Sequence, residues 1–164
     1  RHGVVVFGQS LGAGIGIYGV AHSDAKAHIR AVVAESALSS YRDIAREKLA
    51  GFFLTWPFQW PLSLTLSDTY SPIYAIDRIK SIPILIIHGD RDPIVPLHHG
   101  WRLYKAAVAP KQFWLVRGGG HIQAFTRKAF RQRFVRYLIG IYRGQPGAGG
   151  PAKGGSERKT VKTR

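Results

Sequence analysis

The sequence contains no cysteine, few acidic residues and no long uninterrupted apolar run. Without cysteine there can be no disulfide framework, no thiolate metal site and no cysteine nucleophile, and the chain suits a reducing compartment. The longest apolar stretch, residues 52–66, is interrupted by Pro57, Gln59 and Pro61, so it is too short and too broken to cross a bilayer as a helix. No signal peptide is recognisable before the first apolar run. We therefore expect a cytoplasmic or membrane-associated protein.

Acidic residues are outnumbered by lysine and arginine, 9 against 24, which gives a formal net charge of +15. Two segments carry most of the excess. Residues 127–136 hold five basic residues and no acid, and residues 143–164 hold six basic residues and one acid. A charge confined to one predicted helix and one tail indicates a solvated face. We expect that helix to allow peripheral contact with acidic headgroups at a membrane, and we expect no nucleic-acid partner.

A length of 164 residues with 45% hydrophobic residues suits one domain with a sizeable core. Short apolar runs alternate with segments of helical periodicity, which predicts an α/β fold with a mostly parallel sheet flanked by helices. The predicted strands are residues 4–7, 31–34, 82–88 and 113–116, and the predicted helices are residues 11–20, 97–108 and 122–141. We expect the domain to span residues 1–143. Residues 144–164, rich in glycine and basic residues, should form a disordered tail.

A long insert, residues 41–80, separates the second and third predicted strands. Residues 52–66 contain nine large apolar side chains, too many for a solvated loop. We expect the insert to form a cap over the sheet edge that carries Ser10, with Trp56, Phe58 and Trp60 contacting an apolar substrate. Simple packing of these aromatic residues is the alternative.

The stretch GQSLG, residues 8–12, follows the first predicted strand and opens the first predicted helix. A Gly-x-Ser-x-Gly turn in that position is typical of a nucleophile elbow, in which small neighbours let the backbone pass close while the serine takes a strained conformation. Ser10 is thus the candidate nucleophile, and the backbone N–H of Leu11 is a candidate oxyanion donor. An ordinary turn serine is the alternative for Ser10.

Two further segments supply the partners that a serine nucleophile needs, a base and a carboxylate. The stretch HGDRDPIVP, residues 88–96, places Asp90 and Asp92 after the third predicted strand, and GGGH ends at His121 after the fourth. Either aspartate could orient the histidine, and Glu35 at the end of the second predicted strand is a further candidate. The order serine, acid, histidine along the chain is that of α/β-hydrolases.

These motifs resemble the α/β-hydrolase superfamily, and more narrowly the Bem46-like and ABHD13/ABHD17-like serine hydrolases. The resemblance covers roughly residues 3–141 and matches only the C-terminal half of such a fold, so the N-terminal strands and the loop that gives the second oxyanion N–H are expected to be missing. It implies the triad Ser10, Asp92 and His121, because Asp92 occupies the aspartate of the pattern His-Gly-x-x-Asp-x-x-Val-Pro. The resemblance also implies hydrolysis of esters or thioesters without a cofactor.

His2, His22 and His28 show no spacing with acids that is typical of a metal site, and the sequence predicts no metal. His88 is interpreted as a packed core residue, and His98 and His99 as the solvent-facing start of a helix. Two functions are open: a serine hydrolase of carboxylic esters or thioesters with an apolar acyl group, or a truncated non-catalytic fragment that acts only as an interaction module.

Overall fold

The computed structural model describes residues 3–51, 53–108 and 110–145. The tail predicted for 144–164 lies outside these residues except for its first two. The helices are α1 (Leu11–His22), α2 (Tyr41–Ala50), α3 (Gln59–Leu64), α4 (Leu97–Ala106) and α5 (Lys128–Tyr142), and the strands are β1 (Val4–Gln9), β2 (Ile29–Glu35), β3 (Ile84–Gly89) and β4 (Lys111–Val116). Short 3₁₀ turns connect several of them.

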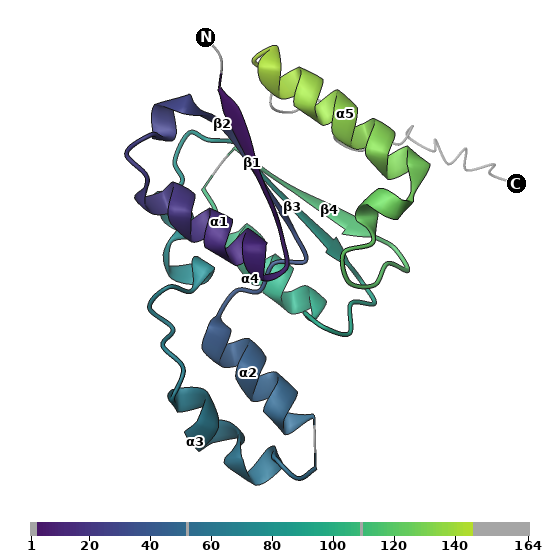
Figure 1. The fold of residues 1–164 in the computed structure, drawn as a ribbon. Helices are drawn as coiled ribbons and strands as arrows, with labels where there is room; N and C mark the ends of the chain where they lie inside the picture. Colours follow the sequence, from purple (N-terminus) through teal and green to yellow (C-terminus); the bar gives the residue numbers. More distant parts are fainter. Residues whose placement is uncertain (1–2, 52, 109, 146–164) are drawn as a thin grey trace, which may run out of the picture.

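The four strands form one parallel sheet in the order β1-β2-β3-β4, so each strand pairs with the one that follows it in the chain. All the carboxyl ends therefore lie at one edge, which we call the carboxyl edge (Figure 1). In the described part of the chain, β1 has a neighbour on one side only. The expected parallel sheet flanked by helices is confirmed.

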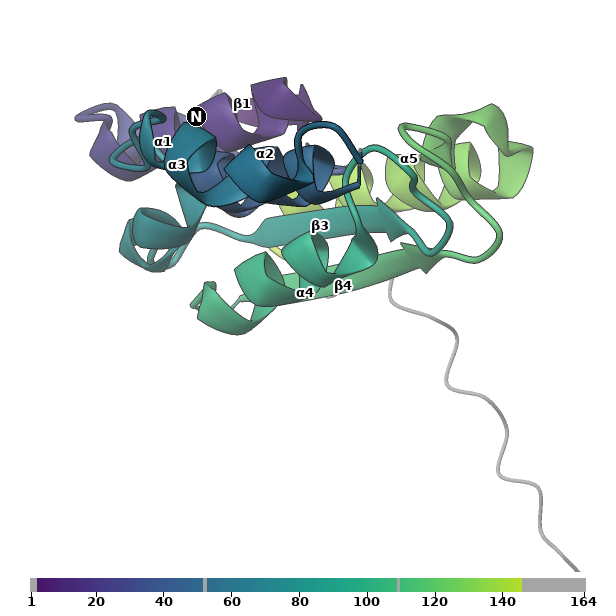
Figure 2. The same ribbon diagram turned by 90° about the horizontal axis from the view of Figure 1, so that it is seen from below.

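Helices cover both faces of the sheet, and each face has its own core (Figures 1 and 2). Side chains of α1 and α4, such as Ile17 and Leu103, pack on one set of strand residues, and Tyr137 and Ile141 of α5 pack on the alternate set. Because successive strand residues point to opposite faces, a strand buried on both faces must be apolar throughout. β3 is buried at every position, which explains why its sequence was recognisable as a strand.

The last helix begins later than the sequence predicts, at Lys128 instead of residue 122. Ile122 has a positive φ of 53°, and the side chain of Gln123 accepts a hydrogen bond from the Gly120 amide at 2.8 Å. A residue with positive φ cannot continue a right-handed helix, so the chain forms a loop and a 3₁₀ turn (Ala124–Thr126) before α5 starts. The predicted apolar stripe from Phe130 to Ile141 does face the core.

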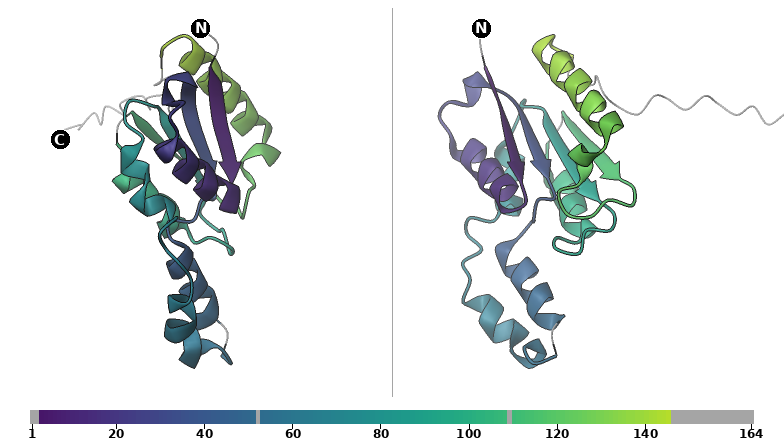
Figure 3. Two further views of the ribbon diagram at one scale, coloured as in Figure 1. Left: turned by 60° about the vertical axis from the view of Figure 1, so that its left-hand side comes forward. Right: turned by 45° about the vertical axis from the view of Figure 1, so that its right-hand side comes forward.

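The insert 41–80 divides into two parts. Residues 41–66, which we call the arm, hold α2 and α3 and project beyond the carboxyl edge (Figures 1 and 3). α2 starts where the Ser40 hydroxyl accepts the amide N–H of Asp43 at 3.0 Å, an N-cap of the usual kind. Residues 67–80 return to the body, where Ala75, Ile76 and Ile79 are buried in the core. Residues 67–80, about a third of the insert, therefore pack with the body of the domain.

Several arginines around α5 contact the protein itself. Arg131 donates to the carbonyls of Phe125 and Thr126, and the Arg133 guanidinium lies 3.8 Å from the centre of the Trp114 ring. The basic segment is therefore only partly a free cationic surface. None of the described helices combines the length and the apolar composition that crossing a bilayer requires.

Candidate active site

Ser10 occupies the turn between β1 and α1 in a strained conformation, with φ 51° and ψ −123°. Its amide donates to the Glu35 carbonyl of the neighbouring strand at 2.8 Å, and its carbonyl accepts from Ala13 at 3.1 Å. A serine rarely adopts a positive φ unless the surrounding structure enforces it. Leu11 is the first residue of α1, so its N–H has no partner within the helix and is available to an anion.

The two glycines that flank Ser10 have different roles. A Cβ on Gly8 would lie 2.5 Å from the Gly12 carbonyl oxygen and 2.6 Å from Ala13 Cα, so only glycine lets the strand pass this close to the helix. A Cβ on Gly12 would meet nothing within 4 Å. The expectation that both glycines serve the close backbone approach is thus correct for Gly8 and wrong for Gly12.

Asp92 and His121 are joined by a hydrogen bond at the carboxyl edge. His121 Nδ1 lies 2.8 Å from Asp92 Oδ2 and 3.1 Å from Oδ1. Oδ1 also accepts the amide N–H groups of Ile94 and Val95, both at 2.9 Å. The carboxylate is therefore fixed by its own loop and holds the histidine ring from one side, as an orienting acid must.

Asp92 is buried, yet it is held in the charged form. Burial alone would raise the pKa of its carboxyl group, but hydrogen bonds from the Val95 amide, His121, the Ile94 amide and the Ser36 hydroxyl outweigh burial and keep that pKa below its ordinary value. A buried carboxylate with this many donors can stabilise a cation on the neighbouring imidazole.

The two alternative acids have other partners. Asp90 accepts the amide N–H of Gly118 at 2.6 Å, in the loop after β4. Glu35 accepts from the Gln9 side chain at 2.8 Å and from the Ala124 amide at 2.9 Å. Glu35 therefore links the strand before Ser10 to the loop after His121. Neither acid forms a hydrogen bond with His121 among the described residues.

Ser36 is a residue of this site that the sequence reasoning missed. It follows β2 with a positive φ of 50°, its hydroxyl accepts the Ile122 amide at 3.2 Å, and it also bonds to Asp92. It thus connects the acid to the residue after His121. The sequence places Glu35 and Ser36 at the end of a predicted strand, but no neighbouring residue distinguishes Ser36 from an ordinary turn serine.

All three triad candidates thus follow strands of one parallel sheet, which places them at its carboxyl edge. Ligands bind at this edge in open α/β sheets. In the described part of the chain no hydrogen bond joins Ser10 to His121, and the Ser10 side chain does not cap α1. Catalytic hydrogen bonds are often long in the absence of substrate.

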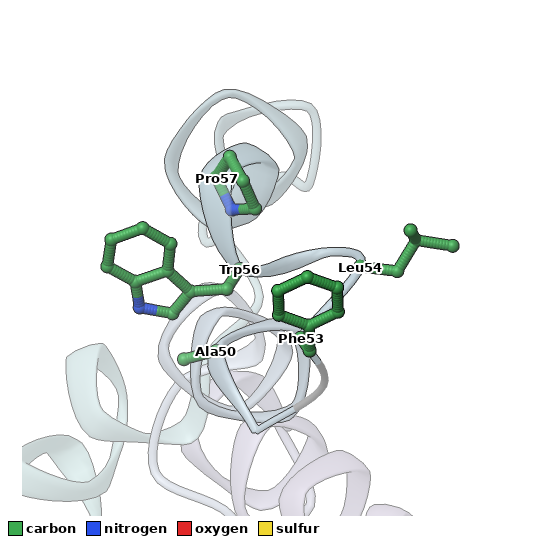
Figure 4. A pocket seen from close by; sticks show the side chains of 5 residues that line it. All are labelled: Ala50, Phe53, Leu54, Trp56 and Pro57. Carbon is green, nitrogen blue, oxygen red and sulfur yellow. The ribbon is translucent and has the colours of Figure 1, made fainter.

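The aromatic residues expected to contact substrate lie on the arm and are largely exposed: Trp56 by 60%, Phe58 by 57% and Trp60 by 59%. Trp56 lines a cavity of about 460 Å³ together with Ala50, Phe53, Leu54 and Pro57 (Figure 4). Phe58 and Trp60 do not line it. None of the three triad candidates lines this cavity, so the arm offers an apolar surface that is separate from the serine.

Of His88, His98 and His99, which the sequence predicts to lie in the core or at a solvent-facing helix start, two are buried. His88 is fully buried and its Nε2 lies 2.8 Å from the Val95 carbonyl, which confirms the interpretation as a core residue. His98 and His99 do start α4, but only His98 faces solvent. His99 is fully buried, with its ring against Ser39, which precedes α2, and Glu47 of α2. The expectation of a solvent-facing pair is thus wrong for His99.

No protein-family model matches the chain. The uncharacterized protein YfhR of Escherichia coli (strain K12) is 32% identical over 139 residues, which cover 83% of this chain and 45% of YfhR. The chain therefore spans about half the length of the curated relatives it matches.

Solved structures of several hydrolases superpose on the chain. The acylaminoacyl peptidase of Pyrococcus horikoshii matches with a TM-score of 0.62 at 18% identity, over 87% of this chain and 24% of the peptidase. The esterase domain of a Rhodothermus marinus protein matches with a TM-score of 0.58 at 18% identity, over 89% of this chain and 61% of that domain. The chain therefore has an α/β-hydrolase fold.

Proposed function

We propose that the protein is a serine hydrolase that cleaves carboxylic esters or thioesters with an apolar acyl group. The observation that carries the proposal is the hydrogen bond between His121 and the buried, charged Asp92, at the same sheet edge as the strained Ser10. The fold shared with esterases and peptidases is consistent with it. The motifs around Ser10 and Asp92 favour a relationship to the Bem46-like and ABHD13/ABHD17-like hydrolases.

In the proposed mechanism Ser10 Oγ attacks the substrate carbonyl carbon while His121 Nε2 takes the hydroxyl proton. The oxyanion that forms accepts the Leu11 N–H at the start of α1. The carbon–oxygen or carbon–sulfur bond then breaks, and the alcohol or thiol leaves with the proton from His121. Water, deprotonated by the same ring, attacks the acyl-serine; the carbon–Oγ bond breaks, Ser10 Oγ regains the proton from His121, and the carboxylic acid is released. Asp92 holds the ring and stabilises its cation in both half-reactions.

An apolar acyl group is proposed because the arm carries a cluster of exposed large apolar side chains beside the carboxyl edge, among them Phe53 at 90% and Leu54 at 68% exposure. An exposed apolar surface of this kind usually marks a binding site for a ligand, a protein or a membrane. We also propose that the basic face of α5 allows peripheral contact with a membrane that presents acidic headgroups.

A fluorophosphonate probe tests the nucleophile, because it reacts covalently only with an activated serine. We expect the purified protein to be labelled and Ser10→Ala to abolish labelling. Ser81→Ala is the matched control, since Ser81 also has a positive φ, 65°, but precedes β3 at the opposite edge of the sheet. Labelling that persists in Ser10→Ala would rule out Ser10 as the nucleophile.

A non-catalytic interaction module is the second candidate. Its support is the apolar arm together with the edge of β1, which pairs with no strand in the described part of the chain and where Val4 and Phe7 are 57% and 45% exposed. An unpaired apolar strand edge is a template for pairing with another strand. A folded protein that the probe does not label would favour this candidate over the hydrolase.

A further inference from the structure

Three side chains that the triad does not use meet where the arm joins the body. Glu47 comes from α2, and His98 and His99 come from the first turn of α4. Glu47 Oε1 lies 2.9 Å from His98 Nε2, and Glu47 Oε2 lies 3.3 Å from His99 Nε2. The two imidazole rings stack with centroids 4.5 Å apart, so both Nε2 atoms face one carboxylate.

We propose that Glu47, His98 and His99 form a divalent metal site that binds Zn²⁺ and joins α2 to α4. Two imidazole nitrogens and a carboxylate oxygen are a common ligand set for zinc, with bonds of about 2.0–2.2 Å. Around a tetrahedral ion such ligand atoms stand about 3.3 Å apart. The three candidate ligand atoms lie within 4.8 Å of one another, so small side-chain rotations suffice to admit the ion.

The surroundings of His99 fix its ring and offer the Ser39 hydroxyl as an acceptor for the tautomer with the proton on Nδ1, which a metal bound at Nε2 requires. Nδ1 lies 2.8 Å from the Ser39 hydroxyl and accepts the Ser39 amide N–H at 3.2 Å. In the free protein Nε2 therefore carries the proton and donates it to Glu47. When an ion displaces that proton, the proton moves to Nδ1, which then donates to the Ser39 hydroxyl oxygen, and the Ser39 amide N–H loses its bond to the ring. A partner of this kind orients most metal-binding histidines.

The charge and the exposure of the cluster also suit an ion. His99 is fully buried and its ring is held between Ser39 and Glu47, so its Nε2 is fixed toward the carboxylate. His98 is 52% exposed, so the ion has a path from solvent and room for a water ligand. Two nearby cations, Arg46 and Arg102, are paired with Asp43 at 3.2 and 2.5 Å, which reduces their repulsion of the ion.

These contacts lie 51 and 52 residues apart in the chain, so no local spacing could predict them. The proposal departs from the expectation of no metal. It is independent of the proposed hydrolase activity, since none of its residues belongs to the triad. Its consequence is mechanical: a bound ion would fix the base of the arm against α4.

Isothermal titration calorimetry and thermal unfolding test the proposal on chelator-treated, buffer-exchanged protein. We expect one Zn²⁺ to bind per chain and to raise the Tm, and Mg²⁺ at the same concentration to have no effect. His98→Ala removes a half-exposed ligand and should fold normally, as circular dichroism can check. It and Glu47→Gln should each weaken zinc binding at least tenfold and remove the Tm shift.

His28→Ala is the matched control, because His28 is exposed and stands outside the cluster. It should bind zinc as the parent does. His121→Ala tests the Asp92–His121 pair as the competing zinc site. The proposal is overturned if zinc neither binds nor raises the Tm, if His98→Ala binds zinc as tightly as the parent, or if His121→Ala and not His98→Ala removes binding.

Discussion

Replacing Asp92 with asparagine isolates the role of one oxygen atom. The amide oxygen of the new side chain can take the place of Oδ1 and keep the hydrogen bonds from the Ile94 and Val95 amides. The NH₂ group then takes the place of Oδ2 and faces His121 Nδ1, which is 2.8 Å away. Two donors cannot share this contact, so Nδ1 must become the acceptor and Nε2 must carry the proton.

An imidazole with its proton on Nε2 cannot accept the proton of Ser10. We therefore expect Asp92→Asn to lower kcat about 10⁴-fold, which corresponds to about 5.4 kcal/mol in the activation barrier. The rate of fluorophosphonate labelling and kcat/KM for a p-nitrophenyl ester measure the loss. Urea unfolding checks that the variant remains folded.

Asp90→Asn is the control two residues away. Asp90 is exposed and accepts only the Gly118 amide N–H among the described hydrogen bonds, which an asparagine oxygen can still do. Its activity should stay within about threefold of the parent. The reasoning is refuted if Asp92→Asn retains more than a tenth of the activity, or if Asp90→Asn loses as much.

Three further predictions follow from packing, burial and exposure. Gly8→Ala should abolish probe labelling because its Cβ would lie 2.5 Å from a carbonyl oxygen, whereas Gly12→Ala should label normally and lose no stability; equal behaviour would contradict the assigned difference. Burial lowers the pKa of His88 in the folded protein, whereas a histidine in the unfolded chain has a pKa of about 6.5. As the pH drops, the unfolded chain is therefore protonated before the folded protein, and the free energy of unfolding should fall between about pH 7 and pH 5. His88→Gln, which keeps the hydrogen bond to Val95, should flatten that slope in urea titrations, and an unchanged slope would assign it to other groups. Trp56→Ala and Trp60→Ala should reduce kcat/KM more for long-chain than for short-chain esters, and equal losses would mean that the arm does not contact the acyl group.

The strands could be predicted because each is an almost uninterrupted apolar run, and burial on both faces of a parallel sheet demands that composition. β3 shows the limit: Ile82 is buried like the strand but lies before it, since Pro83 gives no N–H and the ladder begins at Ile84. The late start of α5 depends on the positive φ of Ile122, which could not be predicted because isoleucine rarely adopts a positive φ.

The candidate triad could be proposed from sequence because each member follows a strand within a short motif. The parts that could not be predicted are long-range. Ser36 contributes through bonds to Asp92 and Ile122, and the buried ring of His99 contacts Ser39 and Glu47, which lie 60 and 52 residues away in the chain. Both outcomes are set by which segments meet in space, and hydrophobic periodicity carries no information about that.

The order of the strands in the sheet bears on how the chain is synthesised. Each strand pairs with its immediate predecessor, so a growing chain can add β2, β3 and β4 one at a time as they leave the ribosome. The Ser10 turn needs only β2, through the bond from its amide to the Glu35 carbonyl. His121 comes after β4, the fourth strand in the described part of the chain. On the proposed mechanism a nascent chain therefore holds a shaped serine before it has a base, and it stays chemically inert until the loop after β4 has been synthesised.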